Sequence, residues 1–253
     1  MELVAGAGFA FAVVKAGGEW LAAILAERHN KKIYGAAHLI YHSGIVVAEL
    51  RGLRSLMNEL FSPLAMFNAE DWDENRRSAW VEKLQSFAQS GSAFGVMDEH
   101  AGALRKLSAP TEEVKALRDR LVELTVNVTH LGEAESTEVD SSEGWQRDVA
   151  EYQARGREEW GNATFQSGPG SPDVLIQSSM PALLWLVRHG EDVEQIKRLR
   201  ALARGLLVTR TRRADKKLAG VVREAEVTFG ELTGLLEDKY KIPSPTWAKA
   251  GAQ

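Results

Sequence analysis

The sequence predicts an all-α fold, with an N-terminal bundle of about four helices followed by a long C-terminal helical hairpin. Large apolar residues between Val46 and Phe67 are alternately 4 and 3 residues apart, which places them on one face of a helix. The segments 114–131 and 218–236 repeat this spacing. Runs that alternate apolar and polar residues, as strands do, are few. Each apolar face must be covered by other helices, so a bundle is expected.

The apolar seam at 46–67 organises the chain. Its members are Val46, Leu50, Leu53, Met57, Leu60, Leu64 and Phe67. The residues between them, Glu49 among them, predict a solvated opposite face. We expect a polar turn at 27–34, a helix start near Gly35 or Ala36, and a kink or new helix at Pro63, which lacks an N–H. The seam is either the core of an intramolecular bundle or a coiled-coil surface for a partner.

Signals in the chain predict where further helices begin and end. Acidic residues at 71–74 predict a helix start, glycines predict a break within 89–95, and the sequence at 108–113 predicts another start. Gly156 predicts a break in a helix with an aromatic face at 145–160. The expected organisation is a bundle at 1–131, an acidic linker with a short helix at 132–173, a helical hairpin at 174–242 and a flexible tail at 243–253.

Composition and motifs argue against catalysis. The 253 residues include no cysteine, which excludes disulfides, thiolate chemistry and cysteine-based metal sites. The sequence also lacks a P-loop, a nucleophile elbow and a Glu-x-x-His pair. We therefore expect a non-enzymatic protein with no cofactor, no metal and no small-molecule substrate.

Histidines and aromatic residues offer two weaker candidate sites. His38 and His42 are four residues apart and could share a metal on one helix face, or they could be ordinary boundary histidines. Trp185, Arg188 and His189 could line a pocket, or they could form the edge of a core.

The N-terminal segment 3–26 is apolar and rich in small residues. Its uninterrupted apolar part, 3–14, is shorter than the roughly 20 residues that span a bilayer. It is expected to be either a buried helix of the bundle or a conditional membrane-inserting helix. The candidate membrane-insertion residues are Phe9, Phe11, Ala12, Val13, Val14 and Trp20.

Charge is unevenly distributed, although the net charge is only −4. Segment 132–173 carries 3 basic and 10 acidic residues, whereas 174–253 carries 14 basic and 9 acidic residues. The basic stretch is either a solvated face or a surface for anionic lipid or nucleic acid. Its candidate residues are Lys197, Arg198, Arg200, Arg204, Arg210, Arg212, Arg213, Lys216 and Lys217. We also predict that the acidic segment 132–143 partly masks this stretch.

Two short stretches resemble the HeLo-like helical domains of cell-death and defence proteins. They are Met1-Glu2-Leu3-Val4-Ala5-Gly6-Ala7-Gly8 and Val47-Ala48-Glu49-Leu50-Arg51-Gly52-Leu53-Arg54-Ser55-Leu56. The resemblance covers residues 1–130. It implies a helical bundle whose N-terminal segment enters membranes after oligomerisation.

Together these features give three expectations about function. The first is an effector that oligomerises and perturbs membranes through 3–26, in defence or cell death. The second is a helical scaffold or adaptor that binds another helical protein through an exposed seam. The third is a nucleic-acid-binding module that uses 197–217. We expect a cytoplasmic protein that either remains there or becomes membrane-associated on activation.

Overall fold

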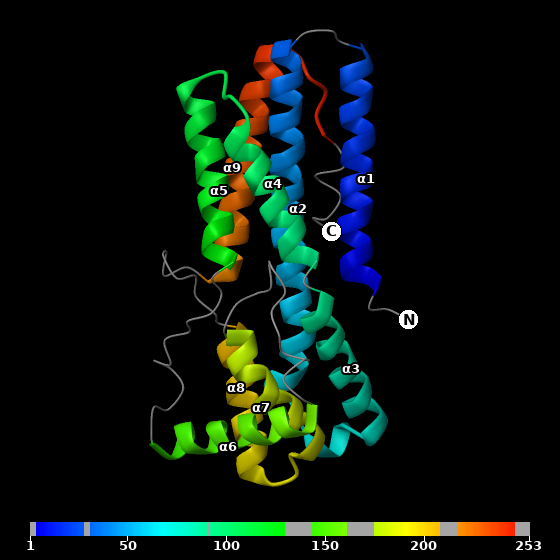
Figure 1. Ribbon diagram of the computed structural model, residues 1–253, viewed down its shortest axis with the longest axis vertical. Helices are drawn as coiled ribbons and strands as arrows, with labels where there is room; N and C mark the ends of the chain where they lie inside the picture. Colours follow the sequence, from blue (N-terminus) through cyan, green and yellow to red (C-terminus); the bar gives the residue numbers. More distant parts are fainter. Residues whose placement is uncertain are drawn as a thin grey trace. The chain divides into compact units, whose positions relative to one another are not determined.

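The computed structural model describes residues 4–27, 31–90, 92–129, 143–160, 175–207 and 217–245. The all-α class is confirmed for these residues (Figure 1). The elements are α1 (Val4–Glu27), α2 (Lys31–Ala65), the short 3₁₀ helix η1 (Ala69–Asp71), α3 (Glu74–Ser90), α4 (Ser92–Lys106), α5 (Glu112–Thr129), α6 (Glu143–Trp160), α7 (Leu175–His189), α8 (Val193–Leu207) and α9 (Leu218–Tyr240).

The described helices group into two compact units, each built from separate parts of the sequence. Unit 1 comprises Met1–Arg54, Ser92–Val128 and Ala219–Gln253, and unit 2 comprises Ser55–Gly91 and Thr129–Leu218. Helix α2 contributes residues to both units, and α8 and α9 fall in different ones. The division into consecutive domains stays a prediction.

Unit 1 contains α1, the first part of α2, α4, α5 and α9, which run alongside one another (Figure 1). Arg51 on α2 forms an ion pair of 2.6 Å with Glu226 on α9. Arg120 on α5 pairs with Glu224 on α9. Helix α1 contacts α4, and its Trp20 indole donates a 3.3 Å hydrogen bond to the carbonyl of Pro243.

Unit 2 contains the end of α2, η1, α3, α6, α7 and α8. Helix α6 crosses α7 (Figure 1). At the crossing, a Cβ built on Gly156 would lie 2.5 Å from the carbonyl carbon of Pro181, closer than real Cβ atoms come. Helix α6 continues through Gly156, so the predicted break there is wrong. The glycine serves close packing between two helices instead.

The predicted seam is confirmed, because all seven of its residues are buried. The predicted solvated face is wrong in one place: Glu49 is only 5% exposed. Every residue from 43 to 50 is buried, so α2 is surrounded on all sides within unit 1. The predicted polar turn at 27–34 is also too long, since α1 ends at Glu27 and α2 begins at Lys31.

Several predicted helix starts are confirmed. The side chain of Asp73 accepts a 2.8 Å hydrogen bond from the backbone N–H of Arg76 at the start of α3. Thr111 accepts one of 3.2 Å from the N–H of Val114 at the start of α5. Helix α3 ends at Ser90 and α4 begins at Ser92, within the range 89–95 in which a break is predicted. These caps satisfy N–H groups that have no partner inside the helix.

Two helices, α7 and α8, occupy the first part of the segment 174–242. Helix α7 ends at His189, and Gly190 donates its N–H to the carbonyl of Leu186 at 2.8 Å. Asp192 caps the start of α8, and its carboxylate accepts a hydrogen bond from the N–H of Gln195 at 2.8 Å. Val193, the first residue of α8, is 67% exposed.

Some predictions concern residues outside the described ones. These are most of the acidic segment 132–143, part of the basic stretch, and the tail beyond residue 245.

Candidate functional site

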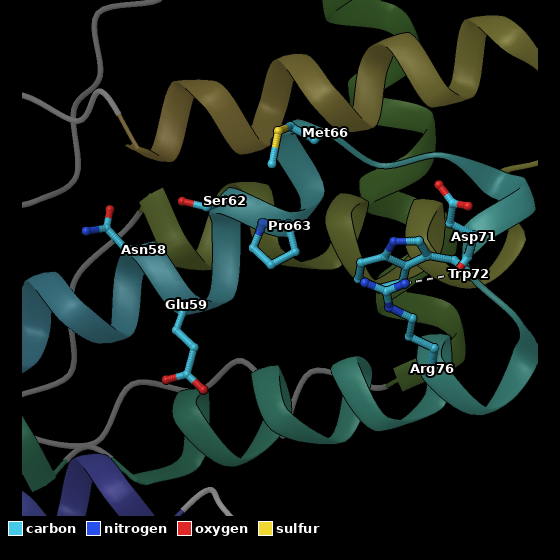
Figure 2. Close-up of a pocket in the computed structure, with 8 residues that line it drawn as sticks. All are labelled: Asn58, Glu59, Ser62, Pro63, Met66, Asp71, Trp72 and Arg76. Atoms are coloured by element: carbon cyan, nitrogen blue, oxygen red, sulfur yellow. Dashed lines mark hydrogen bonds between the residues drawn. The ribbon is translucent and has the colours of Figure 1, made fainter.

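A surface pocket of about 610 Å³ lies in unit 2 at the corner between α2 and α3 (Figure 2). We call it the α2–α3 pocket. It is lined by Asn58, Glu59, Ser62, Pro63, Met66, Asp71, Trp72 and Arg76. Five of these residues are exposed and only Trp72 is buried. The pocket is therefore an open surface feature, unlike the enclosed apolar cavities that hold most small molecules.

The end of α2 shapes one wall of the pocket. Pro63 lies in the last turn of the helix, and no new helix begins there. The N–H groups of Met66 and Phe67 donate to the carbonyls of Pro63 and Leu64 at 3.3 and 3.1 Å, which tightens this end into a 3₁₀-like turn. The chain then turns through η1 into α3. Phe67 is buried, whereas Met66 is 78% exposed beside the pocket.

Trp72 and Arg76 form the opposite wall. The guanidinium of Arg76 lies 4.8 Å from the centre of the Trp72 ring and donates a 2.9 Å hydrogen bond to the carbonyl of Asp71 (Figure 2). The ring of Phe67 also contacts Trp72, and the two ring centroids are 5.0 Å apart. These contacts hold the Trp72 ring in place in this wall of the pocket.

The surroundings of the pocket are mainly acidic. Glu70, Asp71, Asp73 and Glu74 are all exposed within five residues, and Glu59 lies on the facing wall. Lys83 on α3 pairs with Glu59. Arg76 is the only basic residue among the eight that line the pocket. The negative charges outnumber the positive ones, which favours a cationic partner.

Behind the pocket, Arg77 connects α3 to the end of α7. Its side chain is 8% exposed. Its guanidinium donates hydrogen bonds to the carbonyls of Trp72, Val187 and Gly190 at 2.9, 3.0 and 3.3 Å. The last carbonyls of a helix have no partner within it, so Arg77 both satisfies them and holds the Trp72 backbone in place.

Three of the basic residues predicted as an anionic surface have partners within unit 2. Lys197 pairs with Glu194 at 2.7 Å and Arg198 with Asp148 at 3.1 Å. Arg200 donates a 2.7 Å hydrogen bond to the carbonyl of Phe67. Arg204 and Lys217 are exposed. Arg210, Arg212, Arg213 and Lys216 lie outside the described residues.

The membrane-insertion candidates all lie on α1. Ala12 is exposed, Val13 is buried, and Val14 and Trp20 are half-buried. The side chains of Phe9 and Phe11 are not among those described. Among the described residues, no helix combines the length and apolar character needed to cross a membrane.

Other histidines and aromatics named from the sequence have local partners. Trp185 stacks on Tyr152 at 5.2 Å between ring centroids, and His189 lies 2.8 Å from the carboxylate of Glu159. His38 stacks on His42, but no group of three or more histidine, aspartate or glutamate side chains within the described ranges is placed to hold a metal ion.

Sequence reasoning missed the α2–α3 pocket. The acidic residues at 71–74 predict a helix start, and Asp73 does cap α3. The available signal was the combination of a proline, an exposed methionine and a run of acids around one tryptophan. No protein-family model, curated protein or solved structure matches the chain.

Proposed function

We propose that this chain is a non-enzymatic helical adaptor that binds a cationic segment of another protein in the α2–α3 pocket. The observation that carries the proposal is the exposed Met66 beside Pro63 and Trp72, bordered by acidic side chains. An exposed apolar residue bordered by charge of one sign is typical of a protein-binding surface.

The chemistry of the pocket defines the partner. A lysine- or arginine-rich segment would be attracted by Glu70, Asp71, Asp73 and Glu74. An apolar side chain on the same segment would contact Met66 and Pro63. Attraction between exposed charges speeds association and weakens as salt rises, whereas the apolar contact provides affinity that salt does not screen.

The test uses a synthetic amphipathic peptide of leucine and lysine, and a second peptide with glutamate in place of lysine. We expect the full chain to bind the lysine peptide only, with weaker binding at higher salt. Burying most of one apolar side chain contributes about 1–2 kcal/mol. Met66→Ala should therefore raise the Kd about 5- to 30-fold.

Matched variants separate the pocket from the rest of the surface. Val193→Ala truncates another exposed apolar residue of unit 2, which does not line the pocket, and should leave the Kd unchanged. Asp71→Asn should weaken binding and reduce its salt dependence. Equal binding of both peptides, or equal effects of Met66→Ala and Val193→Ala, would contradict the proposal.

A second proposal retains membrane perturbation by α1. It is supported by the composition of α1, in which Lys15, Glu19 and the terminal Glu27 are the only charged residues. Ala12 is exposed, so Ala12→Asp should leave the fold intact while placing a charge in the apolar helix. A charge at the centre of an inserted helix costs roughly 2.5–3.5 kcal/mol. If α1 inserts, Ala12→Asp should abolish dye leakage from anionic liposomes without lowering the unfolding temperature. Unchanged leakage would exclude insertion by α1.

A further inference from the structure

Two histidines from different helices of unit 1 are in direct contact. The Nδ1 atom of His42 on α2 lies 2.8 Å from the Nδ1 atom of His100 on α4. The two residues are 58 positions apart in the sequence. His100 is 7% exposed and His42 is half-buried. This distance is that of a hydrogen bond, so one ring carries a proton on Nδ1 and the other offers a lone pair.

The protonation state of the two rings determines whether this contact is favourable. With both rings neutral, one N–H donates to the other ring. A first added proton can go to the far nitrogen of the donor ring, which leaves the hydrogen bond in place. A second proton must occupy the accepting Nδ1 atom. The two N–H groups then face each other, and two positive rings repel at close range.

The surroundings keep both rings neutral at ordinary pH. Burial, together with the neighbouring His100 and His38, lowers the pKa of His42 to about 4. Burial lowers the pKa of His100 as well, against an opposing effect of Glu99. Tyr41 packs edge-on against both rings, and His38 stacks on His42 at 5.9 Å. Helix α1, which also contacts α4, carries exposed Lys15 and Glu19.

We propose that His42 and His100 form an acid-sensitive clasp that holds α4 against α2 at neutral pH and releases it when both rings are protonated. Because α1 contacts α4, release of α4 also loosens the apolar helix α1. The clasp lies in unit 1 and is independent of the α2–α3 pocket. It gives this chain a means to respond to acidification.

The absence of cysteine allows the clasp to be tested with spin labels. Labels would be placed at Lys31→Cys on α2 and Arg105→Cys on α4, which are both exposed. We expect the distance between the labels to increase on acidification to about pH 4, while far-UV circular dichroism remains helical. If opening requires two protons, the ratio of open to closed molecules should rise up to about 100-fold per pH unit.

Variants connect this opening to the two rings. His42→Gln with His100→Gln removes both titrating groups and should abolish the opening. The single variant His100→Gln leaves one ring, whose protonated form can still donate to the amide oxygen of the glutamine, so the opening should be lost here as well. His189→Gln, in unit 2, is the matched control and should behave as the wild type.

A nitrogen NMR titration keeps the clasp testable if the double variant does not fold. At neutral pH one Nδ1 atom should be protonated and the other unprotonated, and both should be protonated only in the open form. Opening that persists in the folded double variant would overturn the proposal. So would two protonated rings at the closed distance, or loss of the helical signal together with opening.

Discussion

The two units handle buried ionisable groups in opposite ways. In unit 2, the buried Arg77 is permanently charged, and four backbone carbonyls at 2.9–3.3 Å accept hydrogen bonds from its guanidinium. In unit 1, the buried Glu49 and His100 and the half-buried His42 are groups that can lose their charge. Oxygen Oε1 of Glu49 has no hydrogen-bond partner among the described atoms. The difference teaches that a buried group either acquires partners for its charge or becomes neutral.

This contrast has a consequence for pH. Burial raises the pKa of Glu49 to about 7, and it lowers the pKa of His42 to about 4. Between these values Glu49 and His42 of unit 1 both favour their neutral forms. We therefore expect the stability of unit 1 to be highest at mildly acidic pH and that of unit 2 to vary less.

The largest expected effect comes from removing the partnered charge of unit 2. Arg77→Met leaves the carbonyls of Trp72, Val187 and Gly190 without their donor and loosens α3 from α7. Breaking a buried charged network of this kind costs about 3–5 kcal/mol. Urea unfolding followed by tryptophan fluorescence measures it, since Trp72, Trp80, Trp160 and Trp185 lie in unit 2. Arg157→Met, at an exposed position, is the control; equal losses in the two variants would refute the assigned role.

The next effect should appear only above neutral pH. Burial raises the pKa of Glu49 from its ordinary value of 4.5 to about 7 in the folded chain. Because the pKa of Glu49 is higher in the folded state, its contribution to the free energy of unfolding is fully present below pH 4.5. That contribution is lost as pH rises through 7. That shift corresponds to roughly 3 kcal/mol. Glu49→Gln should therefore match the wild type at pH 4.5 and exceed its stability at pH 8.

Thermal unfolding at several pH values measures this difference. Comparing the variant with the wild type cancels the opposite contribution of His42, whose lowered pKa removes stability as pH falls from 6.5 toward 4. Glu231→Gln, an exposed change on α9, should show no pH-dependent difference. A constant offset between Glu49→Gln and wild type at all pH values would contradict the prediction.

A third, smaller effect concerns packing without charge in unit 2. Gly156→Ala places a methyl group against the Pro181 carbonyl. The clashing atoms belong to the backbone, which cannot move aside as a flexible side chain can. Overpacking of this kind costs about 2 kcal/mol. Gly234→Ala on α9 is the control, because a Cβ there meets nothing within 4 Å. We expect it to stabilise slightly through better helix propensity. A Gly156→Ala protein as stable as Gly234→Ala would disprove the close contact.

Local signals account for the parts of the fold that the sequence predicts well. The 3–4 spacing of the α2 seam depends only on helix geometry, and the caps at Asp73 and Thr111 depend on neighbours three residues away. The start of α8 has an equally local signal. Asp192 and Gln195 form reciprocal capping hydrogen bonds after Gly190, so their spacing predicts the end of α7 and the start of α8.

What the sequence could not predict depends on distant contacts. Glu49 occupies a polar position of the α2 pattern, and only the surrounding helices of unit 1 bury it. His42 stacks on the nearby His38, as the sequence allows, but its hydrogen bond is to the distant His100. That bond exists because α4 packs against α2. The α2–α3 pocket likewise requires the turn between two helices to bring Glu59 and Arg76 to the same opening.

The smallest expected effect is at the end of α9 in unit 1. Lys241 has a positive φ of 54° and donates its N–H to the carbonyl of Glu237 at 2.7 Å, so it ends the helix in the left-handed conformation. A lysine side chain is strained there, whereas glycine is not. Lys241→Gly should raise stability by about 0.5–1 kcal/mol, because the relief of strain exceeds the added flexibility of the unfolded chain. Lys239→Gly, inside the last turn of the same helix, removes the same charge and should instead destabilise by about 1 kcal/mol. The two variants therefore separate backbone conformation from charge, and thermal unfolding at one pH is sufficient to compare them. If both glycines lowered the unfolding temperature equally, the end of α9 would not hold Lys241 in the left-handed conformation in solution.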